Sequence, residues 1–492
     1  MVGTKSGFGP NSYTFPFLIN ACARLLNVKI GEEIHNHVVK NGFESDIFIR
    51  NSLIHLYSIF GKLERARVLF GESSDRDLVS FNTMVNGYTR GGRPMDALGL
   101  FREMRGLGIE PDEFTIVALL SACSILSDSR TGKQIHLWAY KELMFRDSKV
   151  MLSALIDMYA KCGMMDIANR VFDTMRTSKT NAAWSSMVSG YTQSGEIEIA
   201  RRYFDQMFER DLVSWTAMIS GYTQTGRYSE ALELFMEMEG VGVKPDEITL
   251  VSTLSACAGL GDLELGKRIH HQYLDTGFFT QNHILATATA NMYAKCGNIE
   301  AALNIFNGVP EKSKTVFLYN AVITGLAQHG ISETAIMFFK EMGLAGLRPD
   351  EITFVGVLCA CSHGGLVEEG KKIFESMLKD HGIKPNIEHN CCMVDLLGRS
   401  GRLVDALEFI QSMPFEIDSV IWRSLLGACK IHGNVEIGEI AGKRLLELEP
   451  EHGAHYVLLS NMFTDAKRWE DSKRVRKLME DKCIIKPPGS SK

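Results

Sequence analysis

Apolar side chains recur along this chain at the spacing of amphipathic helices. Residues 212–246 contain two runs in which they fall at positions i, i+3, i+4 and i+7. The runs are Trp215, Met218, Ile219 and Tyr222, followed by Ala231, Leu234, Phe235 and Met238. Gly226 separates the two runs. After the second run, Gly240 and Gly242 supply a left-handed cap and Pro245 removes a backbone donor. The pattern predicts two helices, each with one apolar face.

A helical hairpin of this size cannot bury both apolar faces by itself, so copies of it must stack on one another. The unit returns along residues 12–418 in three alternating lengths: a long variant with Gly in place of Ala231, a short unit and a standard unit. We predict eleven such repeats with one extra short repeat, in an all-α solenoid of stacked helix-turn-helix repeats. The predicted repeats are 12–46, 47–77, 78–112, 113–148, 149–180, 181–211, 212–246, 247–282, 283–315, 316–350, 351–386 and 387–418.

The ends of the chain do not fit the repeat pattern. We interpret residues 1–11 as the tail of an incomplete repeat and residues 487–492 as a C-terminal tail. The first residues show neither a secretory apolar core nor an Arg-rich presequence. The sequence contains no run of 18 apolar residues, so we expect no membrane span.

Charge and cysteine usage narrow the possible partners and compartments. The 53 basic and 59 acidic residues give a net charge of -6, which argues against a partner held mainly by bulk electrostatics. Nucleic acid read through local contacts remains compatible with it. Of the 11 cysteines, Cys22, Cys123, Cys257 and Cys361 share one repeat position. We therefore interpret them as small core residues in a reducing compartment.

Several phrases recur with the repeats. They are LVSFNTMVNGY at 78–88, LVSWTAMISGY at 212–222, MYAKCG at 158–163 and 292–297, and CMVDLLGRSGRL at 392–403. Together with the alternating lengths, they resemble the PLS class of plant pentatricopeptide repeat proteins, and residues 419–486 resemble the two extension motifs that close such arrays. The resemblance implies a right-handed superhelix that binds single-stranded RNA in the mitochondrion, or alternatively the chloroplast, and directs C-to-U editing.

The resemblance assigns base selection to two positions of each repeat: a polar residue early in the first helix and the last residue of the repeat. On this sequence the pairs are Asn51 with Asp77, Asn82 with Asp112, Ser185 with Asp211, Thr216 with Asp246, and Asn320 with Asp350. An amide and a hydroxyl suit different base edges. By the family's code, Asn with Asp prefers a pyrimidine, usually U, and Ser or Thr with Asp prefers G.

The resemblance also gives a register on the RNA. It places the last short repeat about four nucleotides before the edited C, with chain and RNA parallel and one base per repeat. The expected bases are U at about -6 for 316–350, G at about -9 and -10 for 212–246 and 181–211, and a pyrimidine at about -13 and -14 for 78–112 and 47–77. The long variants lack the pair and should accept any base.

Two other interpretations of these polar residues stay open. An Asn, Ser or Thr at a helix start can serve as an N-cap, and an Asp after Pro can be a turn residue. Three short repeats depart from the pattern, so we assign them no base. Their pairs are Ser153 with Thr180, Thr287 with Thr315, and Cys391 with Asp418.

Other residue groups indicate no metal site or cofactor. His35, His136 and His270 recur in the long variants but lie several repeats apart, so they cannot share a metal. The pairs Cys359 with Cys361 and Cys391 with Cys392 lack a second CxxC or a nearby pair of His residues. We expect the histidines to have packing or surface roles.

Cytidine deamination requires residue strings that this sequence does not contain. A cytidine deaminase carries the strings HxE and PCxxC, and neither occurs here. We therefore predict a non-enzymatic RNA-binding factor, with a DYW-type deaminase supplied by a protein partner of the extension motifs or by a C-terminal continuation. Two alternatives remain: an RNA processing or stabilisation factor without editing, and a protein-binding scaffold of the tetratricopeptide type.

Overall fold

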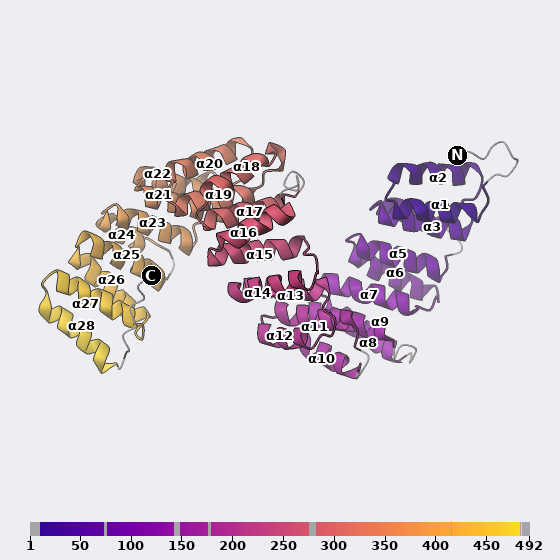
Figure 1. Cartoon of the computed structure of the whole chain (residues 1–492), viewed down its shortest axis with the longest axis horizontal. Coiled ribbons are helices and arrows are strands. Elements are labelled where there is room, and N and C mark those ends of the chain that lie inside the picture. Colours follow the sequence, from indigo (N-terminus) through magenta and orange to yellow (C-terminus); the bar gives the residue numbers. More distant parts are fainter. Residues whose placement is uncertain are drawn as a thin grey trace. The chain divides into compact units, whose positions relative to one another are not determined.

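The computed structural model describes residues 10–72, 76–141, 148–175, 179–274, 282–414, 416–482 and 484. Within these ranges the regular elements are the helices α1 to α28, the π-helical turn η1 and the 3-10 turn η3, with no strand among them (Figure 1). The predicted all-α fold of stacked helical hairpins is confirmed. Residues 1–9 and 487–492, which belong to the two predicted tails, lie outside the described residues.

The chain divides into two units, residues 1–246 and 247–492. The helices of the first unit are α1 (Thr14–Arg24), α2 (Val28–Lys40), α3 (Ile47–Ile59), α4 (Leu63–Gly71), α5 (Leu78–Arg90), α6 (Pro94–Gly106), α7 (Glu113–Leu126), α8 (Ser129–Lys141), α9 (Lys149–Lys161), α10 (Met165–Thr174), α11 (Asn181–Gln193), α12 (Ile197–Asp205), α13 (Leu212–Gln224) and α14 (Tyr228–Gly240).

The helices of the second unit are α15 (Glu247–Leu260), α16 (Leu263–Ile269), η1 (His270–Leu274), α17 (His283–Lys295), α18 (Ile299–Gly308), η3 (Glu311–Ser313), α19 (Val316–Gln328), α20 (Ser332–Leu344), α21 (Glu351–Gly364), α22 (Val367–Lys379), α23 (Ile387–Arg399), α24 (Leu403–Gln411), α25 (Ser419–His432), α26 (Val435–Leu448), α27 (Gly453–Asp465) and α28 (Trp469–Asp481).

The hairpin of α13 and α14 shows how the sequence pattern becomes structure. The apolar residues of both predicted runs are buried, from Trp215 to Met238. The turn between the helices passes through Gly226 with φ at +76°, and α14 is followed by Gly242 with φ at +79°. Only glycine adopts this left-handed conformation without steric cost. Gly240 is the last residue of α14, so Gly242 alone supplies the left-handed cap.

Successive hairpins stack through their first helices. In the first unit α7, α9 and α11 pack side by side, and in the second unit α17, α19 and α21 do the same. Most second helices pack on their own first helix and on the first helix of the next hairpin of the same unit, as α20 does between α19 and α21. Within each unit, the outward face of the first helices is therefore a continuous surface made of equivalent positions.

The long hairpins carry Gly where two helices approach most closely. A Cβ atom at Gly132 of α8 would lie 2.5 Å from the sulfur of Met158 in α9. The neighbouring histidine of the same hairpin, His136, forms a hydrogen bond of 2.9 Å with the hydroxyl of Tyr159. The pairs His35 with Tyr57 and His270 with Tyr293 repeat this bond at 2.7 and 2.8 Å. The expected packing role of these histidines is confirmed.

The cysteines and the helix lengths agree with the sequence interpretation. Cys22, Cys123, Cys257 and Cys361 are buried, and the described cysteines form no disulfide. Burial raises the pKa of each of these thiols, which keeps them protonated and unreactive. Among the helices that the structure describes, none has both the length and the apolar character needed to cross a bilayer.

Candidate functional site

The predicted selecting side chains occupy one equivalent place in the stack. Asn51, Asn82, Ser185, Thr216 and Asn320 are each the fifth residue of a first helix, in α3, α5, α11, α13 and α19. An N-cap precedes the first helical residue, whereas each of these residues is the fifth residue of its helix. The interpretation of these residues as N-caps of their own helices is therefore wrong. Most of them are less than a tenth exposed.

The partner aspartates are caps of the following hairpin. Asp77, Asp112, Asp211 and Asp350 are the N-cap residues of α5, α7, α13 and α21, and each carboxylate accepts a backbone N–H from the first turn. Capping of this kind satisfies backbone donors that the helix leaves open. The aspartates therefore have a structural role in addition to any contact with a ligand.

Every predicted pair is joined by a hydrogen bond between side chains, although its members lie 26 or 30 residues apart. The donor-to-acceptor distances are 3.4 Å for Asn51 to Asp77, 2.9 Å for Asn82 to Asp112, 2.8 Å for Ser185 to Asp211, 3.4 Å for Thr216 to Asp246, and 2.9 Å for Asn320 to Asp350. Each aspartate thus fixes the selecting side chain of the preceding first helix.

Two of the asparagines have a second anchor. The hydroxyl of Thr115, at the start of α7, lies 2.6 Å from Oδ1 of Asn82 and 2.8 Å from Oδ1 of Asp112. Thr353 at the start of α21 repeats this arrangement with Asn320 and Asp350 at 2.6 and 2.9 Å. Each threonine also completes a capping box with its aspartate.

Asn51 lacks this second anchor. The equivalent residue of the next helix is Ser80, whose hydroxyl donates to Asp77 at 2.7 Å. Oδ1 of Asn51 is buried and has no hydrogen-bond partner among the residues that the structure describes. Burial tends to raise the pKa of Asp77, but hydrogen bonds from Ser80 and Asn51 outweigh it and lower the pKa. The carboxylate is therefore ionised at neutral pH and acts only as an acceptor.

Aromatic pairs hold the selecting helices in place. The residue before the selecting position is Phe81, Trp184, Trp215 or Tyr319 in four of the five helices. Each ring meets a Phe of the preceding second helix edge to face, at centroid distances of 4.8 to 5.0 Å. A basic side chain just before the capping residue lies over one or both rings; these are Arg76, Lys179, Arg210 and Lys314. These cations are used in packing.

A row of exposed apolar side chains, which the sequence analysis missed, accompanies the selecting residues. It consists of the second residues of the first helices, Phe48, Val79, Phe114, Val150 and Val213 in the first unit and Ile248, Ile284, Phe317, Ile352 and Val420 in the second. Positions 2 and 5 of a helix share one face. The sequence does contain a signal for this row. In nearly every repeat, the second residue of the first helix is apolar although it does not belong to the i, i+3, i+4, i+7 pattern of the buried face.

In the second unit this surface is hollowed. A pocket of about 660 Å³ is lined by residues of first helices, among them Ile284, Phe317, Asn320 and Lys295. Apolar flanks, a hydrogen-bonding amide and an ammonium group therefore face one cavity. This combination suits a ligand that has a flat ring, polar edges and negative charge.

The three departing short repeats differ in structure as well. In one, the hydroxyls of Ser153 and Thr180 lie 2.7 Å apart. In another, Thr287 donates to the carbonyl of His283 at 2.8 Å, while Thr315 caps α19. In the last, burial and then the charges of Asp395 and Asp418 raise the pKa of Cys391. None of these pairs presents a carboxylate bonded to the selecting side chain.

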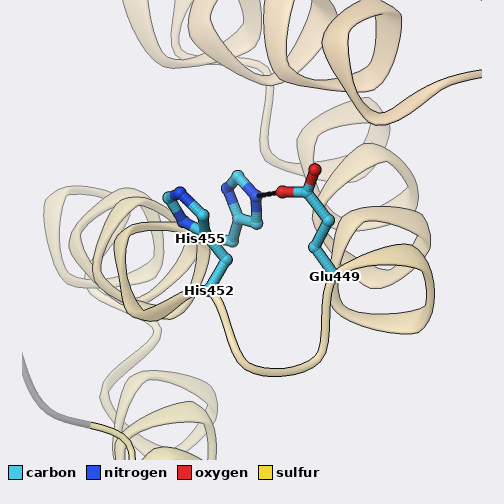
Figure 2. A group of neighbouring side chains, drawn as sticks. All are labelled: Glu449, His452 and His455. Carbon is cyan, nitrogen blue, oxygen red and sulfur yellow. Dashed lines mark hydrogen bonds and ion pairs between the residues drawn. The ribbon is translucent and has the colours of Figure 1, made fainter. Parts of the chain in front are cut away.

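One cluster outside this surface contains residue types that can bind metals. Figure 2 shows that the rings of His452 and His455 face each other, and their centroids are 4.3 Å apart with planes inclined by 19°. Glu449 already accepts hydrogen bonds from His455 and Ser419, both at 2.6 Å. Stacked rings direct their nitrogen lone pairs along nearly parallel planes. We therefore interpret the cluster as a polar junction between α25, the end of α26 and α27.

Family models match most of the repeats. The model described as PPR repeat family matches residues 76–124, 210–259 and 314–363, and the model described as PPR repeat matches 48–78, 150–179, 182–212 and 352–381. A model described as E motif matches residues 432–492. The first predicted extension motif starts at residue 419, which is 13 residues before the start of this match.

Comparisons with whole proteins agree with these matches. The chain is 43% identical, over 98% of its own length and 70% of the relative's, to a pentatricopeptide repeat-containing protein of Arabidopsis thaliana whose name includes "mitochondrial". A second such Arabidopsis protein, with "chloroplastic" in its name, is 38% identical over 99% of this chain and 65% of its own. The crystal structure of the maize protein PPR10 is similar with a TM-score of 0.48 and 17% identity, covering 97% of this chain and 74% of PPR10.

Proposed function

Because the chain belongs to the pentatricopeptide repeat family of plant proteins, we propose that it binds one strand of RNA along the first helices of its repeats. One observation carries this proposal. At five equivalent positions a polar side chain is hydrogen-bonded to the aspartate at the end of its repeat. An exposed residue lies one turn earlier on the same face of the helix. A repeated polar group between apolar flanks suits unstacked bases.

The hydroxyl positions favour guanine over adenine. Ser185 has one proton, and both carboxylate oxygens of Asp211 lie within 2.9 Å of its oxygen. Because the proton points to a carboxylate, the hydroxyl offers only lone pairs to a ligand. The Watson–Crick edge of guanine presents N–H donors, whereas the ring nitrogen of adenine is an acceptor. The same argument applies to Thr216 and Asp246, where the oxygens lie 3.4 Å apart.

The asparagine positions favour pyrimidines. In the networks of Asn82 and Asn320, one N–H donates to an aspartate and one lone pair of Oδ1 accepts from a threonine. Each amide therefore keeps one N–H and one lone pair for a base. Every base presents a donor and an acceptor side by side on its Watson–Crick edge, so two hydrogen bonds can form with it. The preference for pyrimidines is the one that the family's code gives for Asn with Asp.

The apolar row supports the bases from either side. Val79 and Phe317 lie one turn before Asn82 and Asn320 on the same helix face, and both are more than half exposed. Exposed apolar side chains in a regular row indicate a binding surface. Stacking on such side chains does not depend on base identity, so it contributes affinity while the polar pairs contribute selectivity.

Within this RNA-binding role, we propose that the protein recognises sites of C-to-U editing in an organellar transcript. The E motif matched at residues 432–492 supports a role in organellar RNA processing or editing. We propose that a protein partner supplies the DYW-type deaminase and docks on the hairpins beyond residue 418. The names of the relatives support an organellar location, for which we propose the mitochondrion, with the chloroplast as the alternative.

The substitution Thr216→Asn tests the proposal. It replaces a hydroxyl by an amide and should move the preferred base opposite residues 212–246 from G towards U. A mispaired base costs about 1 to 3 kcal/mol, so affinity for the G-containing RNA should fall about five- to a hundredfold and recover when that G becomes U. Binding is measured on both synthetic RNAs, and editing on matching reporter transcripts in cells that supply the deaminase.

Thr225→Asn provides the matched control. Thr225 is the C-cap of the same helix, is exposed, and donates to backbone carbonyls of its own chain segment. The control should bind both RNAs as the unaltered protein does. If Thr216→Asn produces no exchange of preference, Thr216 does not read a base.

A further inference from the structure

The three asparagines of the selecting surface differ in how firmly their amides are held. Asn82 and Asn320 each make two bonds, to an aspartate at 2.9 Å and to a threonine hydroxyl at 2.6 Å. Within the described part of the chain, Asn51 makes one bond, to Asp77 at 3.4 Å, and its buried oxygen has no partner. The threonines belong to the following helix, 33 residues further along the chain.

The orientation of an amide decides between the two pyrimidines. Uracil has a donor at ring position 3 and an acceptor at position 4, and cytosine has an acceptor at position 3 and a donor at position 4. If stacking fixes the ring, the amide atom that faces position 3 determines which base fits. Exchanging Nδ2 and Oδ1 by rotation of the side chain therefore exchanges the preference.

Rotation is costly where the amide has two anchors. In the rotated state of Asn82 the oxygen would face the carboxylate of Asp112 at the distance of the present hydrogen bond, 2.9 Å. The bond from Thr115 to Oδ1 would also be lost. In the rotated state of Asn51 the oxygen would face the carboxylate of Asp77 at a longer distance, 3.4 Å, and among the described residues its oxygen has no hydrogen bond to lose.

We propose that Thr115 and Thr353 are positioning residues that make the repeats of Asn82 and Asn320 discriminate between U and C, whereas the repeat of Asn51 accepts both. The inference rests on the proposed RNA-binding function and adds a third residue to two of the selecting pairs. Thr115 and Thr353 are fully buried, so they act through the asparagine and do not touch the base.

The test uses synthetic RNAs that carry the expected base opposite every selecting pair and differ only in U or C opposite Asn51, Asn82 or Asn320. For the unaltered protein, the ratio of the two dissociation constants should be about three- to tenfold larger at Asn82 than at Asn51, as expected for one additional hydrogen bond. Thr115→Val removes the hydroxyl and should lower the ratio at Asn82 to that at Asn51. Thr353→Val should have the same effect at Asn320.

Ser80→Thr is the reciprocal variant. It gives Asn51 the residue that Asn82 and Asn320 have beside them, and should raise the U-to-C ratio at Asn51. Thr115 also completes a capping box, so Thr115→Val should lower the melting temperature as well. A purely structural role would weaken binding of U- and C-containing RNAs equally and leave their ratio unchanged.

The outcomes separate the two proposals. An unchanged ratio in Thr115→Val, with base preference still lost in Asn82→Ala, would overturn the role of Thr115 and leave the RNA-binding function intact. Equal binding of all RNAs by Asn82→Ala and by the unaltered protein would instead contradict base reading itself. A ratio that falls in Thr115→Val and rises in Ser80→Thr supports the inference.

Discussion

At the scale of single residues, Glu449 shows how one carboxylate joins three helices. It follows α26 and accepts hydrogen bonds from Ser419 at the start of α25 and from His455 in α27. The hydrogen bond from Ser419, followed by that from His455, lowers the pKa of Glu449 to about 2. The ionised form is therefore the one that the folded state stabilises.

This shift predicts a pH dependence of stability. A carboxyl group with a lowered pKa in the folded state contributes stability above its ordinary pKa of about 4.5, and loses that contribution as pH falls towards 2. Glu449→Gln should therefore lower the melting temperature at pH 7, and the difference from the unaltered protein should shrink between about pH 4.5 and 2. Thermal melting at several pH values measures it.

Glu447→Gln is the control in this case. Glu447 lies two residues earlier, in α26, and pairs with Arg444, and both side chains are more than half exposed. Exposed ion pairs contribute little to stability. A difference in melting temperature that stays constant as the pH falls in Glu449→Gln would show that the carboxylate is not the stabilising group.

At the scale of helices, the approach of neighbouring hairpins depends on small residues. A Cβ atom at Gly325 of α19 would lie 2.5 Å from Cβ of Ala294 in α17 and 3.5 Å from its Cα. Ala294 cannot move aside without its backbone. Gly325→Ala should therefore push the two first helices apart and destabilise the second unit by about 1 to 3 kcal/mol.

Gly99→Ala makes the same change without the contact. Gly99 lies in the middle of α6, and among the described residues no atom outside its own helix lies within 4 Å of the added Cβ. Because alanine is the better helix former, this variant should be as stable as the unaltered protein or more stable, by up to about 1 kcal/mol. Helix melting followed by circular dichroism compares the two variants. Equal loss of stability in both would show that the close contact is not the cause.

The helices themselves could be predicted because their signals are local. The apolar spacing from Trp215 to Tyr222 and the break at Gly226 lie within one hairpin. The bonds from Asn82 to Asp112 and Thr115 could not be predicted, because they join residues 30 and 33 positions apart in different helices. The resemblance supplied the first two residues of that network, and only the packing of α5 against α7 identified the third.

At the scale of the whole molecule, a recurring set of arginines joins neighbouring hairpins. Arg93 and Arg227 each join a glutamate of the preceding second helix to an acidic residue in the first turn of their own second helix, and Arg402 repeats this arrangement. Second helices are not the elements that carry the selecting residues. Together with the net charge of -6, this argues against RNA binding held mainly by bulk electrostatic attraction of the phosphates.

Salt should therefore weaken RNA binding only moderately and should not alter base selection. The logarithm of the binding constant falls with the logarithm of salt concentration in proportion to the number of phosphate contacts, and six to ten contacts cost about 10³ to 10⁵ in affinity between about 50 and 200 mM salt. We expect a smaller loss here. Hydrogen bonds to base edges release no counterions, so the ratio of affinities for G and U opposite Thr216 should stay constant over this range. Titrations of both RNAs at several salt concentrations measure the slope and the ratio together. A ratio that collapses as salt rises would show that the preference arises from electrostatic contacts and not from the pair of Thr216 and Asp246.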